Sequence, residues 1–203
     1  MKAVIEVGVN TGQDIGHIYA DHWKTGYKYY GFEPVPFLKN QIIANHGSRS
    51  GFELIEAAVD IDEEPKNFNI QNISNMSGVS SLHEINVDMD PHFMSPYFKY
   101  ADSVTVECKR MDTFIEEKGI DEVVYLHCDA QGNDINVLKS FGEQISKLKA
   151  GVVEASKDEF LYTYKENSQE NITKFLEENN FKITNVLAND STGLEVNIHF
   201  ERA

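Results

Sequence analysis

The sequence predicts an α/β protein whose sheet is mostly parallel, with helices on both faces and an antiparallel hairpin at its C-terminal end. Three observations predict this class. Apolar runs of strand length alternate with helical patterns over residues 3–59. A turn that contains two glycines separates the first strand from the first helix. Residues 189–193 alone join the last two strands, and so short a link can connect only antiparallel neighbours.

The N-terminal part consists of successive strand and helix patterns. We expect buried strands at residues 3–8, 27–32 and 52–59. Apolar residues at helical spacing predict a first helix that begins near Ile15 and ends before Gly26. Pro36 stands where a first-turn proline opens a helix, which runs to about Asn45 and is closed by Gly47. Three strands joined by helices favour a parallel sheet with helices on both faces.

Residues 61–103 interrupt this rhythm with a mixture of Asn, Ser, Met and aromatic residues and a short strand pattern at 67–70. An irregular stretch of this length is usually functional or disordered. Because the first strand begins almost at Met1, we expect this segment to cover the acceptor side of a site as a lid. A surface loop that packs back on the sheet is the alternative. The candidate lid residues are Met76, Ser80, Ser81, His83 and residues 93–100, with Tyr162 and Tyr164 opposite them.

The C-terminal part returns to regular patterns. We expect strands at residues 104–108, 123–128, 150–153, 181–187 and 194–200. Asp112 can cap a short helix that ends before Gly119. The polar turn 129–134 leads into a helix that runs to about Phe141, and Ser168 is a plausible cap for the helix that follows.

Length and charge limit the classes of function. With 203 residues and 41% hydrophobic content, the chain can bury a sizeable core, and we expect residues 1–203 to form a single domain. The formal net charge of −15 disfavours nucleic acid and anionic membranes as partners. Cys108 and Cys128 lack a metal-binding spacing, which favours buried thiols in a reducing compartment. With no signal peptide and no apolar run of membrane-spanning length, we expect a cytoplasmic protein.

Polar residues at the carboxyl ends of the predicted strands mark the expected ligand site, because open α/β sheets bind ligands there. These residues are the turn from Gly8 to Gly12, Glu33, Glu56 with Ala57, Asp129 and Glu154. Glu33 follows the glycine turn by about twenty residues, the position from which an acid accepts the hydroxyls of a ribose. We therefore expect a ligand that contains a nucleoside.

The turn itself indicates which nucleoside to expect. A dinucleotide site needs three glycines against a pyrophosphate, but Asn10 and Gln13 occupy the second and third positions. Glu6, two residues before Gly8, suits an ammonium group, bound directly or through water. S-adenosylmethionine has an amino acid end, a ribose and an adenine, and no phosphate. The turn thus favours S-adenosylmethionine, although the glycine pattern alone also fits an ordinary strand-to-helix turn.

Several motifs resemble, in the same order, those of the FkbM family of S-adenosylmethionine-dependent methyltransferases. They are Glu6–Gly12, Phe32–Pro34, Ala57–Asp60, Met111–Phe114 and Asp129–Asp134, and they span the chain from residue 4 to about 154. The resemblance implies a three-layer, Rossmann-like class I methyltransferase fold with a seven-stranded sheet whose last strand is antiparallel. It also implies methylation of hydroxyl oxygens on sugars or polyketide-like molecules.

The resemblance also implies roles for individual residues. Gly8, Asn10 and Gly12, with Thr11 between them, would hold the methionine end, and Glu33, followed by Pro34, would bind the ribose. Glu56 and Ala57 would lie near the adenine, and Asp129 would face the sulfonium and the acceptor. The chain departs from the family at two positions. His127 stands where the family usually has lysine, and Asp134 stands where it usually has glutamate.

His127 and Asp129 alternate along one predicted strand and therefore share a face. As a catalytic pair, the carboxylate would orient or receive the acceptor hydroxyl and the imidazole would act as the base. A hydrogen-bonded core histidine beneath a structural aspartate is the alternative. A Mg²⁺ ion on Asp129, Asp134 and Glu154 is conceivable, but no ligand spacing demands it and we predict no metal.

Two other functions stay open. A nicotinamide-dependent oxidoreductase would share the fold but is disfavoured by the incomplete glycine pattern. A non-catalytic module that binds the nucleoside and has lost turnover is compatible with the departures at His127 and Asp134. The expected function is the transfer of a methyl group from S-adenosylmethionine to a small-molecule or glycan hydroxyl, with S-adenosylhomocysteine as product.

Overall fold

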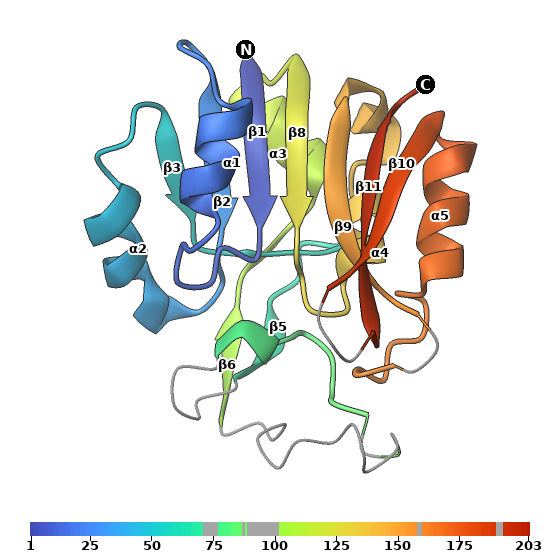
Figure 1. Ribbon diagram of the computed structural model, residues 1–203. Coiled ribbons are helices and arrows are strands. Elements are labelled where there is room, and N and C mark those ends of the chain that lie inside the picture. The colour runs from blue at the N-terminus through green and yellow to red at the C-terminus, as the bar shows by residue number, and fades with distance from the viewer. Residues whose placement is uncertain (71–76, 87, 89–101, 158–159, 190–192) are drawn as a thin grey trace.

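The computed structural model describes residues 1–70, 77–86, 88, 102–157, 160–189 and 193–203. Within these residues, seven strands form one sheet in the order β10-β11-β9-β8-β1-β2-β3 (Figure 1). Their bounds are β1 Lys2–Val7, β2 Lys28–Phe32, β3 Phe52–Ile55, β8 Glu122–Cys128, β9 Ala150–Ser156, β10 Phe181–Ala188 and β11 Glu195–Arg202. β11 runs antiparallel to both β9 and β10, and the pairings from β9 to β3 are parallel. The predicted mostly parallel sheet with a C-terminal antiparallel hairpin is confirmed.

Helices cover both faces of this sheet. One face carries α1 (Ile15–His22) and α2 (Lys39–His46), which follows the short 3₁₀ turn η1 (Pro36–Leu38). The other face packs against α3 (Met111–Lys118), α4 (Asp134–Lys139) and α5 (Gln169–Glu178), and the 3₁₀ turn η3 (Gly142–Lys147) lies between α4 and β9. The layers are therefore helix, sheet and helix, as the alternating pattern predicts.

Each helical layer has its own apolar core. On the face covered by α3, α4 and α5, Phe114, Leu138 and Leu176 pack against Leu126 and Phe200 of the sheet, and all five are at most 2% exposed. On the opposite face, the side chains of Ile15 and Ile42 meet Val4 and Tyr29. These two cores fix the sheet between its helices, so that only the strand ends and their loops remain available for a site.

Two predicted strands are each divided in the structure. The expected strand at 52–59 breaks after β3, because the chain turns at Glu56 and the Ala57 N–H donates to the carbonyl of Ile55 at 3.0 Å. The next two residues form β4 (Ala58–Val59), which pairs with β7 (Cys108–Lys109) outside the main sheet.

The expected strand at 104–108 divides in the same way. Its first part belongs to β6 (Asp102–Val106), which pairs antiparallel with β5 (Lys66–Ile70), and its last residue belongs to β7. A short 3₁₀ turn, η2 (Ser77–Val79), also lies in the predicted lid segment. The β5–β6 pair lies beyond the carboxyl ends of the parallel strands (Figure 1).

The predicted helix ends are partly corrected. Ser168 caps α5 as expected, and its hydroxyl accepts the N–H of Asn171 at 3.1 Å. Asp112 is not a cap, because α3 begins at Met111 and Arg110 holds the cap position. The Asp112 carboxylate instead binds the Arg110 guanidinium, with Nε at 2.9 Å from Oδ1.

The strand order reverses between β1 and β8. From β1 the chain proceeds outward to β2 and β3, and from β8 it proceeds in the opposite direction to β9. Val7 and Cys128, the last residues of these two strands, are register partners. Ligands in open α/β sheets bind where the order reverses in this way. Among the described residues, no helix is long and apolar enough to cross a membrane.

Candidate functional site

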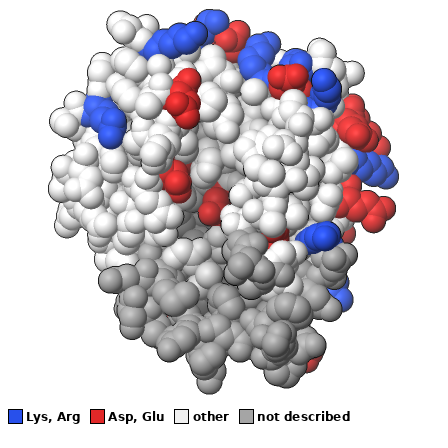
Figure 2. Space-filling view, in the orientation of Figure 1, with Lys and Arg blue, Asp and Glu red and all other residues white. Residues whose placement is uncertain are grey.

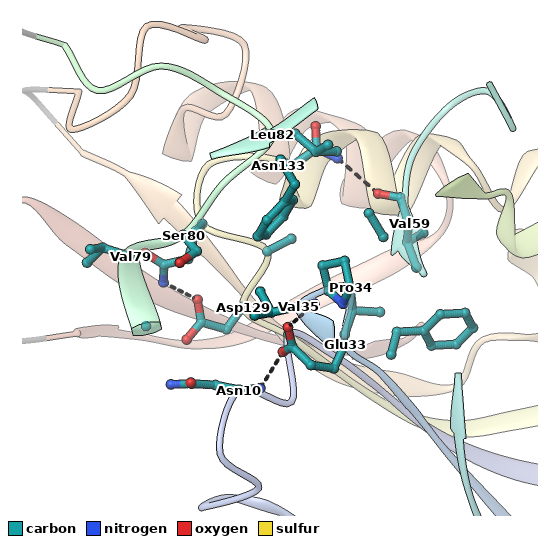
Figure 3. Close-up of a pocket in the computed structure, with 18 of the residues that line it drawn as sticks. Asn10, Glu33, Pro34, Val35, Val59, Val79, Ser80, Leu82, Asp129 and Asn133 are labelled. Carbon is teal, nitrogen blue, oxygen red and sulfur yellow. Dashed lines mark hydrogen bonds between the residues drawn. The ribbon is translucent and has the colours of Figure 1, made fainter. Parts of the chain in front are cut away.

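A cavity of about 460 Å³ opens beyond the carboxyl ends of β1, β2 and β8 (Figure 3). Three parts of the chain form its wall. The strand ends and their turns contribute Val7, Gly8, Asn10, Gln13, Asp14, Phe32 to Val35, Ala57 to Val59, Asp129 to Gln131 and Asn133. The predicted lid segment contributes Phe68, Gly78 to Ser80 and Leu82. The loops near the C-terminal hairpin contribute Leu161, Asn189, Leu194 and Glu195.

Glu33 is held on this wall by two backbone N–H groups. The Asn10 N–H donates to its Oε2 at 2.6 Å and the Val35 N–H donates to its Oε1 at 2.9 Å, as Figure 3 shows. The side chain is 6% exposed, and burial raises the pKa of Glu33 to about 7 despite these two donors. Each carboxylate oxygen keeps a second lone pair, so the group can still accept hydrogen bonds from a pair of ligand hydroxyls.

The turn after β1 brings the main chain close to β8. Gly8 has φ +86°, and a Cβ atom at this position would lie 2.0 Å from the carbonyl oxygen of Asp129. The N–H groups of Gly8 and Val9 both lie 3.1 Å from the Phe32 carbonyl oxygen. Asn10 also has a positive φ, of 51°. Only a glycine allows β1 and β8 to approach at this point, which explains the first glycine of the motif.

A network of polar side chains surrounds Asp129. The Gln131 amide donates to Asp129 Oδ1 and, at 3.3 Å, to Glu154 Oε2. The Tyr162 hydroxyl donates to Gln131 Oε1 at 2.5 Å, which fixes the amide so that its NH₂ group faces the two acids. Asn189 donates to the other oxygen of Glu154. Asp129 lines the cavity, whereas Glu154 is 1% exposed and lies behind the wall.

Burial raises the pKa of several acids at this edge of the sheet. The pKa of Asp134 rises to about 7, and those of Asp129 and Glu154 rise above their usual range. Two carboxyl groups held by one amide cannot easily both be ionised, because each charge disfavours the other. For Glu154, the charge of Asp129 adds to the effect of burial.

The cavity brings together six of the predicted site residues. They are Gly8, Asn10, Glu33, Pro34, Ala57 and Asp129. Thr11 and Gly12 are not on its wall, because the turn has already left the cavity at that point and Gly12 faces the His46 side chain of α2. Glu56 is also off the wall, since its carboxylate lies on the surface and pairs with Lys39 at 2.7 Å.

Glu6 and His127 do not reach the cavity either. They are register partners on β1 and β8, so their side chains lie on one face of the sheet. The Tyr29 hydroxyl donates to Glu6, which is fully buried. Among the described residues His127 Nδ1 has no hydrogen-bond partner, and burial lowers the pKa of this histidine. The predicted roles of Glu6 at the ammonium group and of His127 as base are not supported by this placement.

The described part of the lid segment contacts the cavity and the turn after β8. Ser80 lines the cavity, the Ser81 hydroxyl donates to the carbonyl of Gln131 at 2.6 Å, and His83 Nε2 lies 2.9 Å from Asn133 Oδ1. Tyr164 stacks on His83 with ring centroids 4.4 Å apart. The other lid candidates, Met76 and residues 93–100, lie outside the described residues.

Sequence reasoning missed the contribution of the C-terminal hairpin. The antiparallel direction of β11 brings its first residue, Glu195, to the edge where the parallel strands end, opposite Ser156 of β9. The short turn 189–193 predicts the antiparallel direction of β11, so the sequence did contain a signal for the position of Glu195. Gln131 and Asn133 lie within a recognised motif, but nothing in the sequence shows that their amides face the acids and the lid. In the part of the chain that the structure describes, no group of three or more His, Cys, Asp and Glu side chains is arranged to hold a metal ion.

Comparison with known proteins connects this geometry to a family. Residues 6–183 match the family described as the methyltransferase FkbM domain. Among solved structures, methyltransferase FkbM from Methylobacillus flagellatus KT gives a TM-score of 0.60 at 10% identity, over 98% of this chain and 44% of that chain. No curated protein matches the chain significantly.

Two further solved structures share the fold. Fibrillarin from Aeropyrum pernix, in complex with natively bound S-adenosyl-L-methionine, gives a TM-score of 0.52 at 10% identity, over 98% of this chain and 65% of that chain. TrmK from M. capricolum, in complex with S-adenosyl-homocysteine, gives a TM-score of 0.51 at 8% identity, over 99% of this chain and 62% of that chain. The chain spans less than half of the FkbM structure and about two thirds of the other two.

Proposed function

The chain belongs to the FkbM methyltransferase family, and from this premise we propose that it transfers a methyl group from S-adenosylmethionine to a hydroxyl of a small molecule, a sugar or a glycan. One observation carries the proposal. Asn10, Glu33 and Asp129 lie on the wall of a single cavity at the point where the strand order reverses. That position and a volume of about 460 Å³ suit a ligand of nucleoside size.

Residues from three strand ends would hold S-adenosylmethionine. Glu33 is held by two backbone N–H groups and would accept the ribose hydroxyls. Val35 and Ala57 offer apolar wall beside it for the adenine. Gly8 and Asn10 lie on the wall near the end of β1 and would meet the methionine end.

Asp129 is the residue that would meet the acceptor. S-adenosylmethionine supplies an activated methyl group, so the protein needs chiefly to position the acceptor oxygen. The Asp129 carboxylate would orient the hydroxyl and receive its proton, and Gln131 holds that carboxylate in place. His127 lies outside the cavity wall, so we assign it no part in this step.

The charge of the chain supports a non-nucleic acid acceptor. A formal net charge of −15 opposes the approach of a polyanion, and Asp129 faces the position proposed for the acceptor. A sugar hydroxyl carries no charge and meets no such repulsion. The wall at Ser80, Gln131 and Asn133 is polar, as suits an uncharged acceptor that carries hydroxyl groups.

We extend the proposal to the organisation and compartment of the chain. Residues 1–203 would fold as one domain in which segment 61–103 covers the acceptor side, since Phe68, Val79 and Leu82 already line the cavity. Cys108 and Cys128 are both buried free thiols. Free thiols of this kind are typical of a reducing compartment, which favours the cytoplasm.

Calorimetry and a transfer assay test the proposed function. We expect S-adenosylmethionine and S-adenosylhomocysteine to bind the purified protein with one-to-one stoichiometry, and NAD to give no heat of binding. Incubation with methyl-labelled S-adenosylmethionine and a panel of neutral sugars and glycans should then move label to one class of acceptor. Tight binding of NAD alone would refute the proposal in favour of an oxidoreductase. Binding without transfer to any acceptor would favour the non-catalytic module.

A further inference from the structure

The described wall of the cavity carries acids but no base. It includes the carboxyl groups of Asp14, Glu33, Asp129 and Glu195, and it includes no lysine, arginine or histidine. In the space-filling view, some acidic side chains lie near the middle of the face, and others lie among the lysines and arginines at its edge (Figure 2). A cationic ligand that enters the cavity therefore meets carboxyl groups and, among the described wall residues, no basic side chain.

More carboxyl groups stand directly behind this wall. Glu154 approaches Asp129 through the shared Gln131 amide, and Asp134 accepts the N–H groups of Ala130 and Glu154. Both are at most 1% exposed, and Asp134 Oδ2 has no hydrogen-bond partner among the described residues. Neither acid, nor Glu33 or Asp129, forms an ion pair with a described basic side chain. Within the described part of the chain, none of these four acids thus has an ion-pair partner, and His127 is the basic side chain that acts on Asp129 from a longer distance.

The proposed reaction changes the charge of the ligand that faces this cluster. In the transfer, the S–CH₃ bond breaks and an O–CH₃ bond forms, the sulfonium becomes a neutral thioether, and the hydroxyl proton leaves by way of Asp129 to solvent. The methyl donor has a net charge of +1 from its sulfonium, ammonium and carboxylate groups. The demethylated product has no net charge. Burial strengthens the attraction between the acids and the sulfonium, because the effective dielectric constant of a cavity is lower than that of water.

We propose that the acid-lined cavity distinguishes the methyl donor from its product by charge, so that S-adenosylmethionine binds more tightly than S-adenosylhomocysteine and the spent cofactor leaves readily after transfer. This inference rests on the proposed function and assigns the discrimination to Asp129 and the acids behind it. The consequence is an enzyme that resists inhibition by its own product.

Calorimetry at pH 8 and low salt tests the inference with three probes. They are S-adenosylmethionine, S-adenosylhomocysteine and sinefungin, in which an ammonium-bearing carbon replaces the methylated sulfur. We expect S-adenosylmethionine to bind at least about tenfold more tightly than S-adenosylhomocysteine, and sinefungin to bind nearly as well as S-adenosylmethionine. The order of the three affinities in the wild-type protein tests the inference without any variant.

Variants locate the effect. Asp129→Asn should weaken the binding of S-adenosylmethionine by about tenfold and leave the binding of S-adenosylhomocysteine nearly unchanged. The ratio of the two dissociation constants should then fall toward one. Glu122→Gln is the matched control. Glu122 begins β8 at the opposite end of the sheet from Asp129 and pairs with Lys2 on the surface, so its removal should leave the ratio unaltered.

Each other outcome has a distinct meaning. Equal or tighter binding of S-adenosylhomocysteine would overturn the inference while leaving the proposed function intact. Weak binding of sinefungin beside tight binding of S-adenosylmethionine would show that the methyl group, not the charge, is recognised, and would also overturn it. An unchanged ratio in Asp129→Asn would remove the role assigned to Asp129. Failure of all three probes to bind would refute the proposed function itself.

Discussion

Glu33 shows how a single side chain can be prepared for a ligand. Two backbone N–H groups from Asn10 and Val35, at 2.6 and 2.9 Å, set the plane of its carboxylate before anything binds. These donors come from the turns after β1 and β2, so the position of the carboxylate depends on the correct folding of both turns. Its raised pKa of about 7 follows from burial and indicates a group whose charged form lacks a compensating cation.

Replacing Glu33 by alanine should weaken S-adenosylmethionine binding by about 10- to 100-fold. Buried ribose hydroxyls would lose their acceptor, a loss of about 1–3 kcal/mol. Calorimetry on the folded variant measures the effect. Glu53→Ala is the control, because Glu53 lies on β3 at the surface, paired with Lys118. An unchanged dissociation constant in Glu33→Ala would mean that the ribose lies elsewhere.

Asp129→Ala should lower turnover more than it lowers cofactor affinity. We expect the rate of methyl transfer to fall by about 10²- to 10⁴-fold, because the acceptor hydroxyl would lose the general base that we propose. Affinity for S-adenosylmethionine should fall by only about tenfold, through the lost charge. A transfer assay at saturating cofactor separates the two effects. The reverse pattern would reassign Asp129 to cofactor binding alone.

At the scale of elements, the turn between β1 and α1 decides whether the cavity exists. Its first glycine lets the main chain of β1 touch that of β8, and its third residue, Asn10, donates to Glu33. The positive φ angles of 86° at Gly8 and 51° at Asn10 are therefore part of the site's construction. A residue with a side chain at the first position would separate the two strands at their carboxyl ends.

Gly8→Ala should destabilise the protein by more than Gly26→Ala and should abolish cofactor binding. The two glycines have similar φ angles, +86° and +91°, so both substitutions carry the same backbone strain. Only at Gly8 does the new Cβ meet an atom, the Asp129 carbonyl oxygen at 2.0 Å, whereas Gly26 has nothing within 4 Å. We expect the melting temperature of Gly8→Ala to lie at least about 5 °C below that of Gly26→Ala. Equal melting temperatures for the two variants, with intact cofactor binding in Gly8→Ala, would contradict the close approach of Gly8 to the Asp129 carbonyl oxygen.

Most elements were predictable, and the failures have a common cause. Periodicity and Gly or Pro signals identified the strands of the main sheet, the helices and the closing hairpin. The strands at 52–59 and 104–108 were predicted as continuous because both halves of each are apolar. Which sheet each half joins depends on partners distant in sequence, β4 with β7 and β5 with β6, and a local pattern does not contain that information.

The candidate site was predictable where a residue directly follows a strand of the main sheet and lines the cavity. Glu33 and Asp129 meet both conditions. Glu6 and His127 lie inside strands, and a residue there faces either layer according to a register that only the pairing reveals. Glu56 follows the break after β3, so its side chain turns to the surface. Glu195 was missed because it begins an antiparallel strand, whereas the prediction considered only residues at the carboxyl ends of parallel strands.

For the molecule as a whole, the buried acids predict how stability depends on pH. Burial raises the pKa of Glu6 to about 8 and those of Glu33 and Asp134 to about 7, whereas in the unfolded chain they are about 4. Between these values the folded state binds more protons than the unfolded state. The stability that the three protonated groups contribute is thus fully present below about pH 4 and is lost as the pH rises through 7 and 8.

Without cofactor, the melting temperature should therefore fall by at least about 5 °C from pH 5.5 to pH 8.5. Glu6→Gln should flatten the part of this decline near pH 8, because the amide cannot ionise and its oxygen can still accept from Tyr29. Thermal denaturation across this range, in the wild type and the variant, measures both effects. A melting temperature that rises with pH over the same interval would contradict the raised pKa values.

The central claim is that the cavity at the reversal of strand order holds the cofactor, and a crystal structure with S-adenosylhomocysteine tests it most directly. We predict that the ribose hydroxyls lie within hydrogen-bond distance of Glu33 and that the sulfur faces Asp129 across the cavity. Electron density for the ligand at any other place, or a ribose without contact to Glu33, would contradict the account.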